Sequence, residues 1–191
     1  MTTPPSGSAG RHRAAESTVH EEVSAERFRS AFRGHPGGVS VITADAGAGP
    51  VALTATSVAS VSVEPPALTF SVSEQSSSAP TLREADTVVV HLLAADQLDL
   101  AELGATSGID RFADTSIWRR LPTGEPYFPA ARTWMRGRIT ARLDVGDPRS
   151  SSVLVVEALE ISGDDDRGEA AALVYHDRVW HRLGAHSRIA G

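Results

Sequence analysis

Alternating apolar and polar residues predict that much of this chain forms strands. Between residues 134 and 145, apolar side chains alternate with arginines and a threonine, which is typical of an antiparallel strand with one side in solvent. The apolar side of that strand consists of Met135, Ile139, Leu143 and Val145. Shorter apolar runs predict further strands over residues 39–44, 51–63, 68–72, 87–93 and 153–161, and a closing hairpin of residues 173–176 and 179–183.

Short helices are predicted between some of these strands. Ser24 is a suitable N-cap for a helix that runs through Phe32, and Phe28 and Phe32 are spaced to share its buried face. Two further helices are expected, over residues 80–85 and from a cap at Asp96 to about Leu103. The total is six or seven strands with two or three short helices and no regular βαβ alternation. The pattern therefore predicts a mainly β fold, a barrel with a few short helices added.

The ends of the chain differ in composition from its middle. Residues 1–23 are rich in Ser, Thr, Pro, Gly and charge, which is typical of a disordered leader. We expect a single folded domain over residues 24–184 and a flexible tail over residues 185–191. A chain of 191 residues is long enough for one domain with a substantial core.

Composition and charge exclude several classes of function. The net charge of −6 argues against a protein that binds nucleic-acid phosphates, because such a protein needs an excess of basic residues. The absence of cysteine excludes a disulfide framework, a thiolate-bound zinc ion and a catalytic thiol, and it suits a cytoplasmic protein. No run of about 18 apolar residues is present, so we expect no membrane span.

Familiar catalytic and metal-binding motifs are also missing. We find no G-x-G-x-x-G between a strand and a helix, no phosphate-binding P-loop and no G-x-S-x-G elbow. The histidines lack the spacing of metal ligands, and His176 and His181 fit better as partly exposed strand residues. Asp164, Asp165 and Asp166 fit a solvated turn, so we expect no metal site.

The unusual feature of the sequence is its density of hydroxyl side chains. They fall in one extended segment with Thr54, Thr56, Ser57, Ser60 and Ser62, and in a following strand and loop with Ser71, Ser73, Ser76, Ser77 and Ser78. Hydroxyl and backbone N–H groups suit a phosphate and the polar edge of a flat heterocycle. The N-terminus of the helix after Ser78 would point its partial positive charge at the same place. A polar surface loop explains the same residues, and composition leaves both interpretations open.

Five ordered segments resemble the flavin reductase-like family of FMN-binding split barrels. The segment 53–66 reads LTATSVASVSVEPP, and residues 38–43 before it read GVSVIT. Ser76-Ser77-Ser78 resembles the serine-rich phosphate loop of the family, and Asp110-Arg111-Phe112 resembles its Asp-Arg-Phe element. The closing segment 175–183, YHDRVWHRL, is similar to the terminal hairpin. The resemblance covers about residues 25–184.

The resemblance implies a split β-barrel with Greek-key topology that transfers hydride from NADH or NADPH to FMN or FAD. It also implies a homodimer with the flavin near the subunit interface and a flavin-dependent monooxygenase that receives diffusible reduced flavin. In this chain the implied flavin-binding residues are Thr54, Ala55, Thr56, Ser57, Ser71, Ser73, Ser76, Ser77, Ser78 and Arg111. No catalytic side chain is implied, because the cofactors carry the chemistry.

Two residues depart from the family pattern. Thr56 stands where many members have Asn, and it keeps one donor and one acceptor. Pro148, in Gly146-Asp147-Pro148, replaces a histidine that lies near the nicotinamide in many members. The dinucleotide could instead meet Tyr175, His176 or Arg149. Two alternatives stay open, namely a flavoprotein with bound flavin and its own substrate, and a non-enzymatic flavin or haem carrier.

Overall fold

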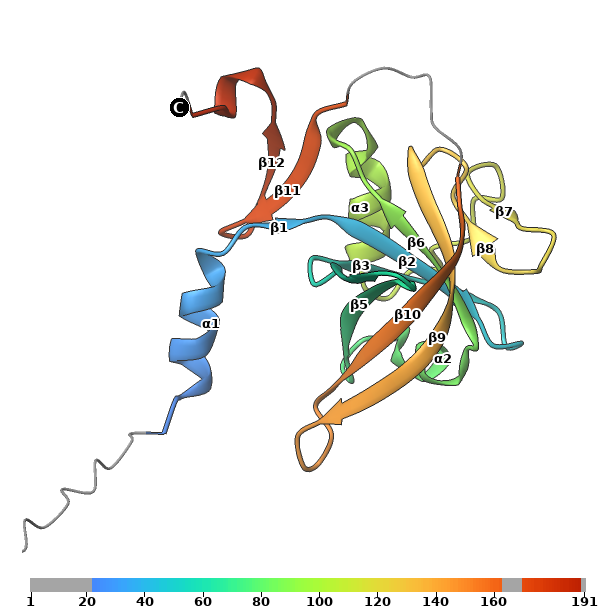
Figure 1. Cartoon of the computed structure of the whole chain (residues 1–191), viewed down its shortest axis with the longest axis horizontal. Helices are drawn as coiled ribbons and strands as arrows, with labels where there is room; N and C mark the ends of the chain where they lie inside the picture. The colour runs from blue at the N-terminus through green and yellow to red at the C-terminus, as the bar shows by residue number, and fades with distance from the viewer. Residues whose placement is uncertain (1–21, 163–169, 190–191) are drawn as a thin grey trace, which may run out of the picture.

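The main feature of the computed structural model is a seven-stranded antiparallel sheet that curves into a barrel (Figure 1). The structure describes residues 22–162 and 170–189. The strand order is β3-β2-β6-β9-β10-β5-β4. The strands are β2 (Ser40–Asp45), β3 (Pro50–Ala55), β4 (Ala59–Val63), β5 (Pro66–Ser73), β6 (Thr87–Leu92), β9 (Thr133–Val145) and β10 (Ser151–Ile161). The mainly β split-barrel fold expected from the sequence is confirmed.

The barrel is split where its two edges approach each other. Strand β3 pairs only with β2, and β4 pairs with β5 only as far as Thr69. The last residues of β5, up to Ser73, therefore have no strand partner on the β4 side. The predicted strand 51–63 is interrupted at residues 56–58, just at this split. The backbone groups on this edge therefore need hydrogen-bond partners other than a neighbouring strand.

Two apolar clusters fill the interior. One lies inside the barrel and includes Leu68, Phe70 and Val72, which lie on one face of β5. Helix α2 (Ala79–Glu84) closes one end of this cluster with Leu82, which is fully buried. The other cluster lies under helix α3 (Leu98–Ala105) and includes Phe112 and Phe128.

A second, smaller sheet stands beside the barrel. It joins β1 (Gly37–Gly38) to the hairpin of β11 (Ala172–His176) and β12 (Val179–Leu183). Asp177 and Arg178 form the hairpin turn with φ values of 47° and 66°, which is the twist that tight hairpins prefer. Two-residue strands β7 (Arg119–Arg120) and β8 (Pro126–Tyr127) lie between the third helix and β9, and a 3-10 turn (Ala185–Ser187) lies in the predicted tail.

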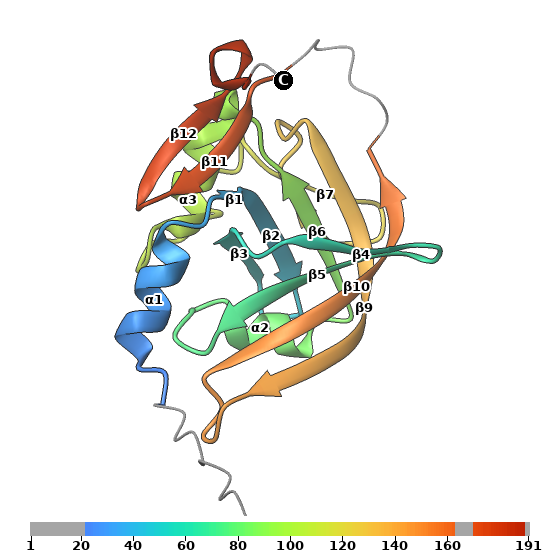
Figure 2. The ribbon, with the colours of Figure 1, turned by 60° about the vertical axis from the view of Figure 1, so that its left-hand side comes forward.

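Helix α1 (Ala25–Arg33) forms as predicted, but its apolar face is not buried. Ser24 caps the helix, with its hydroxyl oxygen accepting from the N–H of Arg27 at 3.2 Å. The exposed fractions of Phe28 and Phe32 are 57% and 58%, their ring centroids lie 4.7 Å apart, and the His35 ring lies 6.1 Å from Phe32. The expectation of a buried face is wrong within one chain, because α1 projects away from the barrel (Figures 1 and 2).

Two further expectations are corrected at the ends of elements. Leu143 and Val145 are 65% and 43% exposed, because the β9–β10 hairpin extends beyond the barrel, where no second layer covers it. Asp96 does not cap α3 and lies instead in a 3-10 turn (Ala95–Gln97), where its carboxylate pairs with Arg132 at 2.7 Å. The predicted turn at Asp164–Asp166, like residues 1–21 of the predicted leader, falls outside the described residues.

One histidine is a fully buried part of the barrel. The Nδ1 atom of His91 lies 2.9 Å from the carbonyl oxygen of Val41, and its Nε2 atom lies 3.0 Å from the N–H of Phe128. A carbonyl only accepts and an N–H only donates, so the imidazole is neutral with its proton on Nδ1. Burial lowers the pKa of His91 to about 4, and the hydrogen bond to Val41 offsets part of this effect.

We expect this histidine to make the protein sensitive to acid. The unfolded chain takes up a proton at the ordinary His pKa of 6.5 while the folded chain does not, so stability is lost as the pH falls from 6.5 toward 4. The loss amounts to about 3 kcal/mol. Denaturant titrations across this range would measure it. His91→Gln should remove this part of the slope, and His35→Gln, at an exposed position, should leave it intact.

Candidate functional site

The predicted flavin segment, Thr54 to Ser57, lies at the split of the barrel. The Thr54 hydroxyl points inward and donates to the carbonyl oxygen of Ala101 in α3 at 2.7 Å. Ala55 is buried, whereas Thr56 and Ser57 are exposed. A Cβ atom on Gly37 would lie 2.8 Å from the Thr56 Cβ, so only glycine lets β1 pass this close. Thr54 therefore anchors the segment from inside, and Thr56 presents a hydroxyl at the surface.

Ser57 joins the two hydroxyl-rich segments across the split. Its hydroxyl oxygen accepts from the N–H of Ser71 at 3.0 Å and lies 3.4 Å from the Ser71 carbonyl oxygen. Side-chain bonding thus holds the end of β3 to β5 where strand pairing is absent. The hydroxyl of Ser71 itself has no partner among the described residues, so it is available to a ligand.

The serine loop between β5 and α2 offers several further donors. Backbone N–H groups donate to the hydroxyl oxygens of Ser73 and Ser76, which leaves the O–H groups of both side chains unassigned. Ser77 is exposed. Ser78, in contrast, is fully buried, and its hydroxyl donates to the carbonyl oxygen of Ala52 at 2.8 Å. Ser78 therefore fixes α2 to β3, and its side chain does not reach the surface.

Arg111 reaches the serine loop from the segment that follows α3. Its Nη1 atom lies 3.3 Å from the Ser77 hydroxyl oxygen, and its Nη2 atom donates to the carbonyl oxygen of Thr106 at 2.6 Å. The Nε atom is buried and has no hydrogen-bond partner among the described residues. A buried donor without a partner is costly, and an anion between Arg111 and the loop would satisfy it.

These groups fit a phosphorylated, flat cofactor. The Arg111 guanidinium and the hydroxyls of Ser76 and Ser77 would hold a phosphate, while the hydroxyls of Thr56 and Ser71 would face the polar edge of a ring system. No cluster of three or more His, Cys, Asp or Glu side chains within residues 22–162 and 170–189 could hold a metal ion. In the same residues, no helix is long and apolar enough to cross a membrane.

The residues expected on the nicotinamide side fall into two separate groups. Gly146, Asp147 and Pro148 form the turn of the β9–β10 hairpin, which Arg149 ties to the serine loop through a 2.9 Å ion pair with Glu74. Tyr175 and His176 lie at the β11–β12 turn, and Figures 1 and 2 both show the two turns well apart. The structure therefore does not bring the two groups together.

Tyr175 and His176 lie beside Thr56, in a cavity of about 350 Å³ under α1. The cavity is lined by Phe28, Arg29, Phe32, Arg33, His35, Thr56, Tyr175, His176, Asp177 and Arg178. The α1 residues were not among the predicted site residues, although Arg29 and Arg33 follow Phe28 and Phe32 directly. Arg29 and Arg33 are four positions apart and so share one face of the helix, and this spacing could have indicated that α1 contributes to a site.

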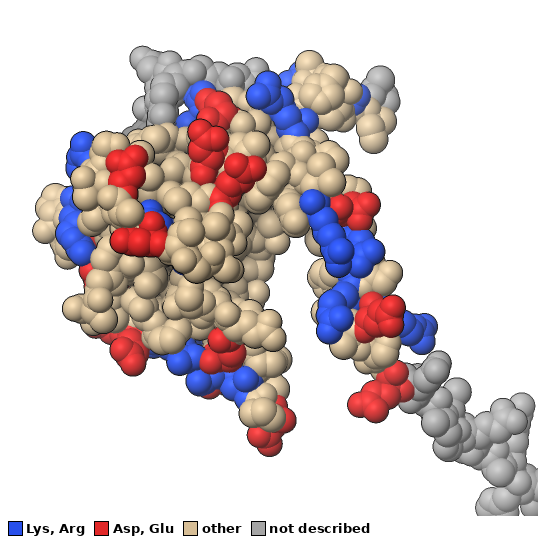
Figure 3. Space-filling view, turned by 180° about the vertical axis from the view of Figure 1, so that it is seen from behind, with Lys and Arg blue, Asp and Glu red and all other residues tan. Residues whose placement is uncertain are grey.

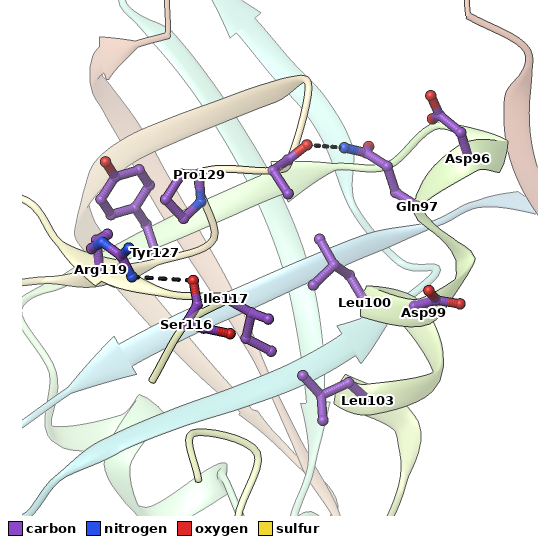
Figure 4. Close-up of a pocket in the computed structure, with 11 residues that line it drawn as sticks. Asp96, Gln97, Asp99, Leu100, Leu103, Ser116, Ile117, Arg119, Tyr127 and Pro129 are labelled. Atoms are coloured by element: carbon purple, nitrogen blue, oxygen red, sulfur yellow. Dashed lines mark hydrogen bonds between the residues drawn. The ribbon is translucent and has the colours of Figure 1, made fainter. Parts of the chain in front are cut away.

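A larger cavity, of about 900 Å³, lies on the other side of α3 and was not predicted (Figure 4). Leu100 and Leu103 of α3 form one apolar wall, and Ile117 lies opposite them. The Arg119 guanidinium at its rim is bonded to the carbonyl oxygens of Thr115, Ser116 and Trp118. Sequence patterning gave no signal for it, because one wall comes from the irregular segment between α3 and β9.

Comparison with known proteins identifies the family that this fold and site define. The model of the flavin reductase-like domain family matches residues 32–184. The chain is 41% identical over 169 residues to an NADH:FMN oxidoreductase of Rhodococcus qingshengii, covering 88% of this chain and 87% of the relative. The chain therefore belongs to the flavin reductase-like domain family.

Two solved structures support the same assignment. A flavin reductase domain protein from Arthrobacter sp. FB24 superposes with a TM-score of 0.76 at 31% identity, over 83% of this chain and 95% of that one. BorF, the flavin reductase component of a bacterial two-component tryptophan halogenase, gives a TM-score of 0.71 at 30% identity, over 84% of this chain and 98% of BorF.

Proposed function

We propose that this protein is an NADH:flavin oxidoreductase with FMN as its preferred flavin. The observation that carries the proposal is the contact of Arg111 with Ser77 beside the barrel split, because it assembles donors for a phosphate next to an exposed ring-binding edge. The 41% identical relative named NADH:FMN oxidoreductase supports the choice of NADH and FMN.

The residues of the split have different tasks in this proposal. When bound, the flavin supplies the hydride-accepting chemistry. Arg111 and Ser77 hold its phosphate, and Thr56 donates a hydrogen bond to the polar edge of the ring, where it stabilises the negative charge that reduction adds. Thr54 and Ser57 keep the segment in place, through Ala101 and Ser71. The protein thereby fixes the distance and orientation of the two reacting rings.

A homodimer is part of the proposal, with the flavin near the subunit interface. An apolar groove of about 340 Å³ beside β4 and β5 supports it. The groove is lined by Val58, Ser60, Ser62, Pro66, Ala67, Leu68, Leu92, Met135, Ala158 and Ile161. A second copy that covered this groove would remove exposed apolar area that single subunits rarely leave bare.

We further propose that the reduced flavin diffuses to a flavin-dependent monooxygenase and that the reaction takes place in the cytoplasm. BorF, at 30% identity, is the reductase component of a two-component halogenase, which supports a role in supplying reduced flavin. The exposed position of the split fits a flavin that enters and leaves during turnover.

Mixing the purified protein with FMN and NADH separates this proposal from its alternatives. Catalytic loss of the near-ultraviolet absorption of NADH is the expected result. Retained flavin colour without NADH oxidation would favour a flavoprotein with its own substrate, and flavin or haem binding alone would favour a carrier. The carrier is kept as an alternative because Pro148 supplies no side-chain donor at the β9–β10 turn.

Removing the surface hydroxyls of the flavin segment should weaken both binding and reduction. We expect Thr56→Ala combined with Ser57→Ala to raise the FMN dissociation constant by about tenfold, since two hydrogen-bonding groups are lost. The single substitution Thr56→Ser should behave like the parent, because serine retains the hydroxyl donor. Fluorescence titration measures the affinity, and unchanged affinity and reduction rate in the double variant would show that the segment does not contact flavin.

A further inference from the structure

The cavity between α1 and the β11–β12 turn, which we call the α1 cleft, has a fixed wall on each side. The N–H of Asp177 donates to the carbonyl oxygen of Arg33 at 3.1 Å, so the end of α1 is tied to the hairpin turn. β1 pairs with β11 through Gly37 and Tyr175, which holds the hairpin beside the flavin segment. Thr56 lies in the floor of the cleft, so the cleft opens directly beside the proposed ring-binding edge.

The α1 cleft gathers unpaired positive charge in an acidic protein. Arg29, Arg33 and Arg178 line it, all three are exposed, and none has an ion pair or side-chain hydrogen bond among the described residues. Several arginines elsewhere are paired with carboxylates, as Arg120 is with Asp45 and Arg136 with Glu125. Figure 3 shows basic side chains along α1 below its junction with the body. One carboxylate, Asp177, accompanies the three cations, which leaves an excess of positive charge for an anionic ligand.

The same cleft offers flat apolar surfaces. Phe28 and Phe32 lie 4.7 Å apart between ring centroids, and His35 lies 6.1 Å from Phe32. On the opposite wall Tyr175 packs against Trp180 at 4.6 Å. Rings of this kind stack on heterocyclic bases, and arginines bind phosphates through paired N–H donors. Both kinds of group together fit a ligand with phosphates joined to a flat base.

We propose that the α1 cleft binds the pyrophosphate and adenosine half of the nicotinamide dinucleotide, so that the nicotinamide is directed toward Thr56. This inference rests on the proposed NADH:flavin oxidoreductase function. It gives the reductant a binding site that does not require a histidine at the β9–β10 turn, where this chain has Pro148. Arg29 and Arg33 bind the pyrophosphate from α1, and Arg178 binds it from the hairpin turn.

The test compares two hydride donors in the Arg29→Gln/Arg33→Gln variant of the full chain. NADH carries the pyrophosphate and adenosine, whereas N-benzyl-dihydronicotinamide carries neither. We expect the variant to raise the KM for NADH about tenfold or more with little change in kcat, because charge-assisted contacts are lost from binding. The KM for the benzyl compound and the FMN dissociation constant should stay unchanged. The variant should fold normally, since α1 has no buried residue.

Arg27→Gln is the control variant, because it removes one positive charge from the same helix at a position that does not line the cleft. It should leave the KM for NADH within about twofold of the parent. Equal KM changes for the two donors, or no change for either, would overturn the assignment. A selective loss of FAD affinity relative to FMN would place the adenosine half of FAD in the cleft instead and would also overturn it. A parent protein that binds flavin but oxidises neither donor would reject the proposed function itself.

Discussion

Replacing Arg111 with alanine is expected to raise the dissociation constant of FMN by about 30- to 100-fold, an effect of about 2 to 3 kcal/mol. The guanidinium contacts Ser77 and Thr106, and its buried Nε has no partner among residues 22–162 and 170–189. It is therefore placed to give charge-assisted hydrogen bonds to a phosphate. The FMN dissociation constant of Arg111→Lys should lie between those of the parent and Arg111→Ala, because lysine keeps the charge but not the forked donors.

Riboflavin, which has no phosphate, is the control ligand for this substitution. Its affinity should be the same for the parent and for Arg111→Ala if the arginine acts on the phosphate alone. Arg119→Ala is the matched control variant, because it too removes an arginine that is bonded to loop carbonyls, but at a distance from the serine loop. An equal loss of riboflavin and FMN affinity would mean that Arg111 only holds the loop together.

Adding a single methyl group to α3 is expected to disturb the flavin segment from inside the protein. A Cβ atom at Gly104 would lie 2.3 Å from the Thr54 hydroxyl oxygen and 3.1 Å from the Thr54 backbone nitrogen. Because α3 and β3 must separate to admit it, we expect Gly104→Ala to lower the free energy of unfolding by about 2 kcal/mol. FMN affinity should fall as well, since Thr54 to Ser57 would shift with β3.

A double-variant cycle separates this steric effect from a general loss of stability. Thr54→Ala removes the closest atom and, by itself, one hydrogen bond to Ala101. The Gly104→Ala/Thr54→Ala variant should therefore lose less stability than the sum of the two single losses. Denaturant titration of all four proteins gives the coupling free energy, and strict additivity would show that the two positions do not compete for space.

The strand pattern of the barrel was predictable because its signal is local. Leu68, Phe70 and Val72 alternate with polar residues, and they do so because one side of β5 faces the core. The loop of serines and the short helix after it were likewise visible, since Pro80 stands in the first turn of α2. Resemblance to the family added the topology, which spacing along the chain did not determine.

Contacts between distant segments were not predictable in the same way. The spacing of Phe28 and Phe32 correctly indicated an amphipathic helix, but it did not say that no other part of the described chain covers it. Ser78 has the same side chain as Ser77, yet it is buried against Ala52, because the fold of α2 turns it inward. The partner of Arg111 lies 34 positions away, so that pairing became visible only with the fold.

The most direct test of the central claim is anaerobic mixing of the purified protein with FMN and NADH in equal amounts. We predict that the visible absorption of the flavin and the near-ultraviolet absorption of NADH disappear together, one flavin reduced for each NADH oxidised. The rate should be far above that of the same mixture without protein, and Arg111→Ala should slow it when FMN is scarce. Tight binding of FMN with no acceleration of its reduction by NADH would contradict the account.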